Sequence, residues 1–165
     1  MDLKRFWRHV LMSPLKATRA FPSETLDVLQ REVAAQEKRH RGEVCILIEA
    51  ELTSGQLWHD LATRDRARQL FALRGVWNTQ ENNGVLIYVL LAERKVEIVA
   101  DRGIDKRVRP EEWQAICRAM EAAFAGKRYE EGALAGVRAV SDLIARDFPA
   151  NGEERNELPD RPALI

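Results

Sequence analysis

The fold of this chain is decided by residues 82–104, which read NNGVLIYVLLAERKVEIVADRGI. Residues 84–91 are apolar at almost every position, a pattern typical of a strand that is buried on both faces. A short polar turn follows, and residues 95–100 then alternate between polar and apolar side chains, which indicates a second strand nearer a sheet edge. The segment therefore predicts a β-hairpin whose first strand is central.

The predicted hairpin brings two polar segments together at one edge of the sheet. Because its strands run in opposite directions, Glu81, Asn82 and Asn83 lie at the start of the hairpin, close to its end at Asp101. Asp105 follows four residues later. Carboxylate and amide oxygens are the ligands that Ca²⁺ prefers, and Mg²⁺ needs fewer of them. We therefore expect these five residues to form a Ca²⁺ or Mg²⁺ site. The alternative is a simple Asn-Asn-Gly turn and an aspartate that bonds to nearby amides.

The rest of the chain contributes helices and one more strand. Residues 44–48 form a continuous apolar run, which again predicts a strand buried on both faces. Apolar residues at helical spacing predict helices over residues 2–12, 23–40, 63–74, 110–126 and 129–148. Since a helix links the first two strands, we expect them to be parallel with a right-handed crossover. The sequence thus predicts an α/β fold, a compact α/β/α sandwich with a small mixed central sheet flanked by helices.

Composition indicates one globular domain with a distinct segment at each end. The 165 residues include 26 basic and 26 acidic side chains, so no overall field favours nucleic acid as a partner. We expect a basic amphipathic segment over residues 1–22, the α/β domain over 23–148 and a polar, flexible tail over 149–165. No run has the length or apolarity of a membrane span or signal peptide, which favours a cytoplasmic location, with peripheral attachment to the inner membrane as the alternative.

The N-terminal segment combines cations with an apolar stripe. If residues 2–12 are helical, apolar side chains fall on one face, at Leu3, Phe6, Trp7, Val10 and Leu11. We favour docking of this stripe on the domain's own surface or on a second copy of the chain. Contact with an anionic membrane surface or a membrane protein stays open, because aromatic residues beside cations suit a membrane interface. The residues of such a contact would be Lys4, Arg5, Phe6, Trp7 and Arg8.

No nucleophile motif is present in the sequence. Gly-x-Ser-x-Gly, a Walker loop and His-Glu-x-x-His are all missing from it. Cys45 and Cys117 lie in apolar runs without the spacing of a zinc or redox site, and we expect both to be buried thiols. Residue patterns alone therefore do not establish that the protein is an enzyme.

Three segments resemble the TPM-domain family: residues 40–48 (HRGEVCILI), residues 82–104 and residues 126–137 (GKRYEEGALAGV). The resemblance implies an α/β/α sandwich, in agreement with the predicted elements, and an association with calcium or another divalent ion. Family members include a thylakoid acid phosphatase and bacterial envelope proteins, and this chain is similar to a short, soluble bacterial subset. Only residues 82–84 match the family's motif before the strand, whereas residues 101–103 and 109–110 depart from its pattern.

Three functions are consistent with these observations. We favour a calcium-binding module with a binding or regulatory role, which needs no nucleophile. The second is a metal-dependent acid phosphatase, in which an ion at Asp101, Asp105 and Asn82 would polarise a phosphoryl oxygen and activate water. The third is a peripheral membrane module that docks through its N-terminal helix.

Overall fold

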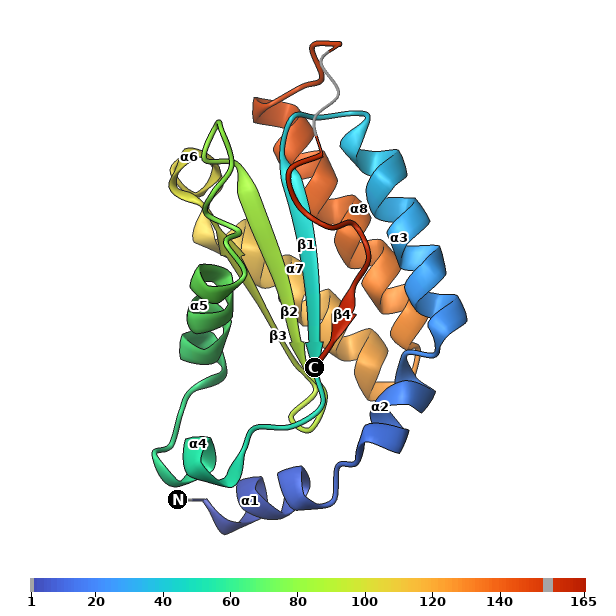
Figure 1. Cartoon of the computed structure of the whole chain (residues 1–165), viewed down its shortest axis with the longest axis vertical. Coiled ribbons are helices and arrows are strands. Elements are labelled where there is room, and N and C mark those ends of the chain that lie inside the picture. Colours follow the sequence, from blue (N-terminus) through green and yellow to red (C-terminus); the bar gives the residue numbers. More distant parts are fainter. Residues whose placement is uncertain (1, 153–155) are drawn as a thin grey trace.

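The computed structural model of this protein describes residues 2–152 and 156–165, and it has a mixed four-stranded sheet between two layers of helices (Figure 1). The α/β/α sandwich predicted from the sequence is confirmed. The elements in chain order are α1 (Leu3–Val10), α2 (Pro14–Ala20), α3 (Ser23–Glu37), β1 (Glu43–Glu49), α4 (Ser54–Trp58), α5 (Thr63–Leu73), β2 (Gly84–Leu90), β3 (Lys95–Ala100), α6 (Arg102–Asp105), α7 (Pro110–Ala125), α8 (Tyr129–Asp147) and β4 (Ala163–Leu164). The short elements α2, α4, α6 and β4 were not predicted.

The first strand of the hairpin, β2, lies inside the sheet, whose strand order is β3-β2-β1-β4. β1 and β2 are parallel, in a register that runs from Glu43–Gly84 to Glu49–Leu90. β3 is antiparallel to β2 and forms one edge, as the alternation in its sequence predicted. Because β2 has a partner strand on each side, its apolar residues are covered by neighbours in the sheet and by helices above and below it.

Two apolar cores explain why β1 and β2 are apolar throughout. Alternate residues of a strand point to opposite faces of the sheet. Val44, Ile46 and Ile48 of β1 therefore pack in the core beneath α3, α7 and α8. Cys45 and Leu47 pack in the second core, which includes residues of α4 and α5. Cys45 is buried as predicted, whereas Cys117 on α7 is partly exposed, and neither forms a disulfide.

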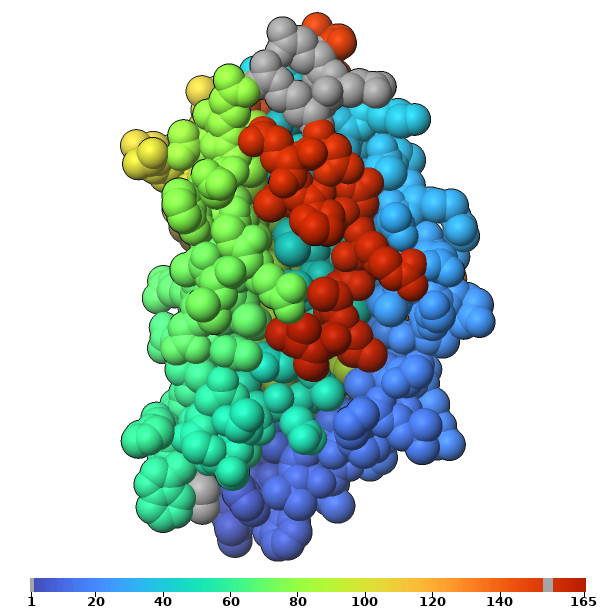
Figure 2. Space-filling model, in the orientation of Figure 1, coloured from blue at the N-terminus to red at the C-terminus, as the bar shows by residue number. Residues whose placement is uncertain are grey.

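The C-terminal segment closes the second edge of the sheet. β4 pairs in parallel with β1, and Figure 2 shows the segment lying across the molecule between α3 and the part of the chain around α5. The backbone N–H of Leu158 donates to Glu43 Oε2 (3.0 Å), and Arg161 pairs with Asp27. The sequence predicted a flexible tail here. Its polar composition concealed this attachment, because the contacts are made largely by charged side chains and by a strand of only two residues.

Candidate functional site

Helix α1 is attached to the domain through its polar side chains. Arg5 donates from Nε to Glu93 Oε1 (2.6 Å) and from Nη2 to the carbonyl oxygen of Leu61 (2.6 Å). His9 is 1% exposed, and its Nε2 lies 2.9 Å from the same oxygen of Glu93. Its Nδ1 accepts from the backbone N–H of Leu52 (3.0 Å). Because Nδ1 accepts, the neutral ring carries its proton on Nε2 and donates it to the carboxylate.

Glu93, in the turn between β2 and β3, holds this attachment together. Burial alone would raise the pKa of Glu93, but hydrogen bonds from His9, Arg5 and Thr63 overcome that effect and lower the pKa to about 2. The carboxylate is therefore charged at neutral pH and binds three donors from two helices. Sequence reasoning missed Glu93, because an acidic residue in a hairpin turn is ordinary on its own.

Attachment through polar groups leaves the apolar stripe of α1 exposed to solvent. The exposed fractions are 62% for Leu3, 52% for Trp7, 52% for Val10 and 64% for Leu11, and Leu15 of α2 is 60% exposed. Phe6 is partly buried and packs against the core beside α4 and α5. The predicted docking of the stripe on the domain's own surface is therefore wrong for every stripe residue except Phe6. The physical reason is that two hydrogen-bonding side chains on the opposite side of the helix, the partly buried Arg5 and the buried His9, fix its orientation.

Exposed cations surround these apolar side chains. Lys4, Arg8, Lys16 and Arg19 are all exposed, and Asp2 is the single acidic residue among residues 1–22. We call this surface the N-terminal face and define it by these four cations and the exposed side chains of Leu3, Trp7, Val10, Leu11 and Leu15. Of the five contact residues predicted from sequence, Lys4, Trp7 and Arg8 lie on this face, whereas Arg5 and Phe6 point toward the domain.

The hairpin edge does converge, and much of it is occupied by internal bonds. Both carboxylate oxygens of Glu81 accept hydrogen bonds from Arg41 Nη1 (2.5 Å each). Asn82 has a left-handed backbone (φ 53°), and its Oδ1 accepts from Arg102 Nε (3.1 Å). Asn83 is 1% exposed and donates from Nδ2 to the carbonyl oxygen of Arg41 (2.6 Å), while its Oδ1 is buried without a hydrogen-bond partner. The edge therefore contains one unpaired amide oxygen.

The second half of the predicted metal site is divided between one buried and one exposed aspartate. Asp101 caps α6 by accepting from the backbone N–H of Arg102 through Oδ1 (2.7 Å), and its Oδ2 is buried without a partner. Asp105 is exposed. Within residues 2–152 and 156–165, no group of three or more His, Cys, Asp or Glu side chains is arranged to hold a metal ion. A cation at this edge would therefore need amide and backbone carbonyl oxygens as well.

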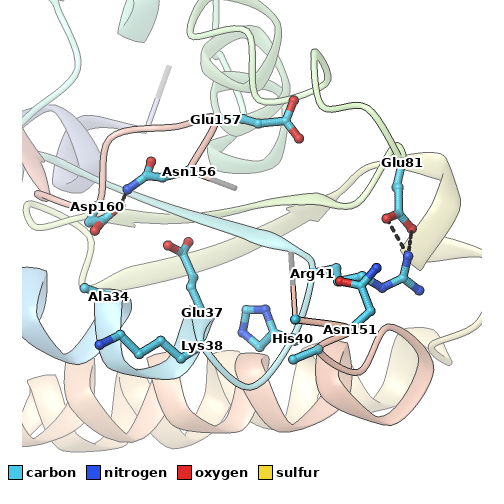
Figure 3. Close-up of a pocket in the computed structure, with 12 residues that line it drawn as sticks. Ala34, Glu37, Lys38, His40, Arg41, Glu81, Asn151, Asn156, Glu157 and Asp160 are labelled. Atoms are coloured by element: carbon cyan, nitrogen blue, oxygen red, sulfur yellow. Dashed lines mark hydrogen bonds and ion pairs between the residues drawn. The ribbon is translucent and has the colours of Figure 1, made fainter. Parts of the chain in front are cut away.

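A cavity of about 480 Å³ lined by charged side chains lies beside the hairpin edge, under the C-terminal segment (Figure 3). Glu37, Glu157 and Asp160 line it, and the imidazole of His40 is buried there with both nitrogens unpaired. Burial, with a contribution from the neighbouring carboxylates, raises the pKa of Glu37 to about 8. Burial lowers the pKa of His40 to about 4. Lys38, Arg41 and Glu81 line the cavity as well, and Arg41 is paired with Glu81, so the cavity combines acidic and basic side chains with a neutral ring and does not favour one sign of charge.

None of the described helices has the length and apolarity required to cross a bilayer.

Comparison with known proteins assigns the family. The family model of the TPM domain matches residues 16–143. Similar solved structures include the NMR structure of protein BA42 from the psychrophilic bacterium Bizionia argentinensis, with 24% sequence identity, a TM-score of 0.76 and coverage of 87% of this chain and 94% of that chain. Another is the N-terminal domain of a protein from P. gingivalis, with 22% identity, a TM-score of 0.61 and coverage of 81% of this chain and 86% of that chain. Both likenesses concern the fold, and no curated protein matches. Because the family model covers most of the chain, this protein belongs to the TPM-domain family.

Proposed function

We propose that this protein is a peripheral module that attaches to anionic membrane surfaces through its N-terminal face. The observation that carries the proposal is the orientation of α1. Arg5 and His9 bond to Glu93 on the inner side, so that Trp7 and its apolar neighbours point away from the domain. An apolar stripe of this kind is normally buried, and a contiguous exposed one marks an interaction surface.

The composition of the face favours a lipid surface as its partner. Trp and Leu side chains can enter the boundary between headgroups and acyl chains, while Lys and Arg remain at the headgroups. Each cation near an anionic bilayer contributes about 1 kcal/mol, and each large apolar side chain that becomes buried contributes about 1.5–3 kcal/mol. The four cations of the face and two or three inserted side chains together reach the roughly 8 kcal/mol of micromolar binding.

Vesicle co-sedimentation of the full chain tests the proposal. Phosphatidylcholine vesicles with and without phosphatidylglycerol are compared at low and high salt. We expect binding only when phosphatidylglycerol is present, and weaker binding at high salt because salt screens the cations. Trp7→Ser should lower the affinity about tenfold, the effect of losing roughly 1.4 kcal/mol of apolar contact. Trp77→Ser is the matched control, since Trp77 is 54% exposed in the loop between α5 and β2.

Three results would refute membrane attachment. The first is equal sedimentation with neutral and anionic vesicles, and the second is an equal loss of affinity in both tryptophan variants. The third is sedimentation equilibrium showing a stable dimer that Trp7→Ser dissociates and that does not bind vesicles. The face would then be an interface between two copies of this chain.

A second candidate function is the binding of a divalent cation at the hairpin edge. The specific observation is that Asn83 Oδ1 and Asp101 Oδ2 are both buried without partners, and unpaired buried oxygens are costly. Gly103 also packs closely against the backbone carbonyl oxygens of Glu81 and Asn82, which adds two oxygens to this region. Ca²⁺ accepts such a mixture of carboxylate, amide and backbone ligands, whereas Mg²⁺ would retain more water.

Calorimetric titration of Ca²⁺, then Mg²⁺, into chelator-stripped protein tests this candidate. We expect one saturable site that is lost in Asp101→Asn, a substitution that keeps an N-cap for α6. Asp65→Asn, at an exposed position on α5, is the control. Absence of binding, or equal binding by both variants, would remove the metal from the hairpin edge.

Phosphomonoester hydrolysis would depend on the same metal, which would supply a bound water as the nucleophile. Turnover of an aryl phosphate that disappears in chelator and in Asp101→Asn would support the phosphatase alternative. Turnover that survives both treatments would have another origin.

A further inference from the structure

A second cavity of about 860 Å³ opens beside the N-terminal face. Its lining comes from α1 and α2, from the turn between β2 and β3 and from the turn between α7 and α8. These segments are far apart in the sequence and meet at the end of the sheet where α1 and α2 lie (Figure 1). Five cations line it, and we call it the basic cavity: Arg8, Lys16, Arg19, Arg94 and Lys127.

The charge of the basic cavity is not neutralised by the surrounding protein. Among the described residues none of its five cations forms an ion pair, and Lys16 Nζ donates to the carbonyl oxygen of Leu11 (2.5 Å). Glu93 is the one acidic residue of the lining, and its oxygens are engaged by Arg5, His9 and Thr63. A ligand in the cavity would therefore lie near several cationic side chains that have no ion-pair partner in the described structure.

Two of the cations come from turns with unusual backbone geometry. Arg94 (φ 52°) and Lys127 (φ 60°) both occupy the left-handed region, which Gly or Asn would adopt at lower cost. Both side chains are exposed, and neither makes a hydrogen bond with the domain in the described structure. Their identity therefore contributes little to folding, and their shared location points to a role in binding.

Apart from Glu93, the remaining lining is apolar or aromatic and comes from Leu11, Met12, Ala20, Leu91, Ala92 and Tyr129. A cavity with cations and an apolar wall suits a ligand that joins a phosphate to a hydrocarbon part. Its volume is that of a small-molecule site and greatly exceeds the space needed by one inorganic ion. Arginine is well matched to phosphate oxygens, with which it forms paired hydrogen bonds.

We propose that the basic cavity binds the phosphate headgroup of an anionic lipid, and prefers a phosphomonoester headgroup. The preference follows from charge, because a phosphomonoester carries about −1.5 to −2 at neutral pH, against one charge for a diester. This inference rests on the proposed attachment of the N-terminal face to a membrane. The face would supply general attachment to anionic lipid, and the cavity would supply selectivity for the headgroup.

The test uses vesicles of matched net charge that contain either phosphatidic acid or phosphatidylglycerol. We expect the wild type to bind phosphatidic acid vesicles about tenfold more tightly. The double variant Arg94→Gln with Lys127→Gln should lose more affinity for phosphatidic acid than for phosphatidylglycerol, so that it binds the two kinds of vesicle equally. Lys106→Gln with Arg118→Gln removes two exposed cations elsewhere and is the control. A wild type without preference, or a control that loses it equally, would overturn the inference.

A soluble arm separates this inference from the proposed function. Glycerol 3-phosphate and inorganic phosphate are titrated without vesicles and followed by NMR shifts. If glycerol 3-phosphate binds the wild type and not the Arg94→Gln, Lys127→Gln variant, the cavity is supported even where vesicle attachment fails. If vesicles containing phosphatidylglycerol bind but neither the headgroup nor phosphatidic acid is favoured, the cavity proposal fails and membrane attachment stands. Equal affinity for inorganic phosphate and glycerol 3-phosphate would assign the cavity to free phosphate and overturn the lipid ligand.

Discussion

Replacing Glu93 by Gln should release α1 from the domain. The carboxylate accepts from Arg5 Nε (2.6 Å), His9 Nε2 (2.9 Å) and Thr63 Oγ1 (3.0 Å). Gln has the same shape but no charge: its one oxygen could still accept from Arg5 and His9, and its amide nitrogen would face the hydroxyl of Thr63. Arg5 would then lose its anionic partner in a position where its side chain is only 15% exposed. His9 would keep only a neutral acceptor in a buried place.

The size of the effect follows from the pKa of Glu93. It falls from 4.5 in the unfolded chain to about 2 in the folded protein, which corresponds to about 3 kcal/mol of stability. Since the folded pKa is depressed, this contribution is complete above the unfolded pKa. It is lost as the pH falls from about 4.5 toward 2. The difference in free energy of unfolding between wild type and Glu93→Gln should therefore be about 3 kcal/mol at pH 7 and much smaller at pH 2.

Urea unfolding at several pH values measures this difference, and hydrogen exchange of the α1 amides shows whether the helix has detached. Glu131→Gln is a suitable control, because Glu131 and its partner Arg128 are 64% and 57% exposed. Such an exposed pair contributes about 0–1 kcal/mol. Equal stability of Glu93→Gln and the control at pH 7 would refute the reasoning. A difference that does not change with pH would also refute it, since the carboxylate charge would then play no part.

Three further substitutions test other parts of the structure. In the wild type the Arg66 guanidinium lies 2.7 Å from the buried carboxylate of Glu49, and Arg66→Met removes this counter-charge. The free energy of unfolding in urea should fall by about 3–5 kcal/mol, and a loss below about 1 kcal/mol would contradict this. Relative to wild type, Glu37→Gln should be increasingly more stable from pH 5 to pH 8, because between pH 4.5 and about 8 the folded wild type holds a proton that its unfolded chain has already released. The gain at pH 8 should exceed the ~1.4 kcal/mol of one pKa unit, and equal curves would refute it. Gly84→Ala places a methyl group against the carbonyl oxygen of Val76 and should cost about 1–3 kcal/mol, seen as a lower Tm; an unchanged Tm would show that the loop moves freely.

The central strands could be read from the sequence because their pattern reports burial directly. In β1 and β2 each face packs against an apolar core. Odd-numbered and even-numbered residues are therefore both apolar, and each strand appears in the sequence as an unbroken apolar run. The crossover helix then fixed the parallel pairing of these strands. The register placed Gly84 beside Glu43, and the polar ends of the hairpin met as predicted. β4 could not be predicted, because a strand of two residues is too short to show the alternation of polar and apolar side chains.

The orientation of α1 could not be inferred from hydrophobic periodicity. A helical stripe shows which side of a helix is apolar, and the usual inference is that this side is buried. Here Arg5 and His9 on the other side find a carboxylate that lies 84 residues or more along the chain. The charge-assisted hydrogen bonds of Arg5 and His9 stabilise this orientation more than exposure of the apolar stripe destabilises it. A local sequence pattern cannot predict a hydrogen-bond partner so far along the chain. The same limit hid the basic cavity, which combines cations from three separate segments.

The two candidate binding regions lie at opposite ends of β2. Gly84 begins the strand beside the hairpin edge with its unpaired oxygens, and Glu93 and Arg94 follow the other end, beside the N-terminal face and the basic cavity. A strand of seven residues separates them by roughly 20 Å. Sites at that distance with no shared partner affect stability and binding additively. Asp101→Asn should therefore leave vesicle binding unchanged, and Trp7→Ser should leave any calcium titration unchanged. If either variant altered the other site, the sheet would have to transmit the change, and the two regions would belong to one functional unit.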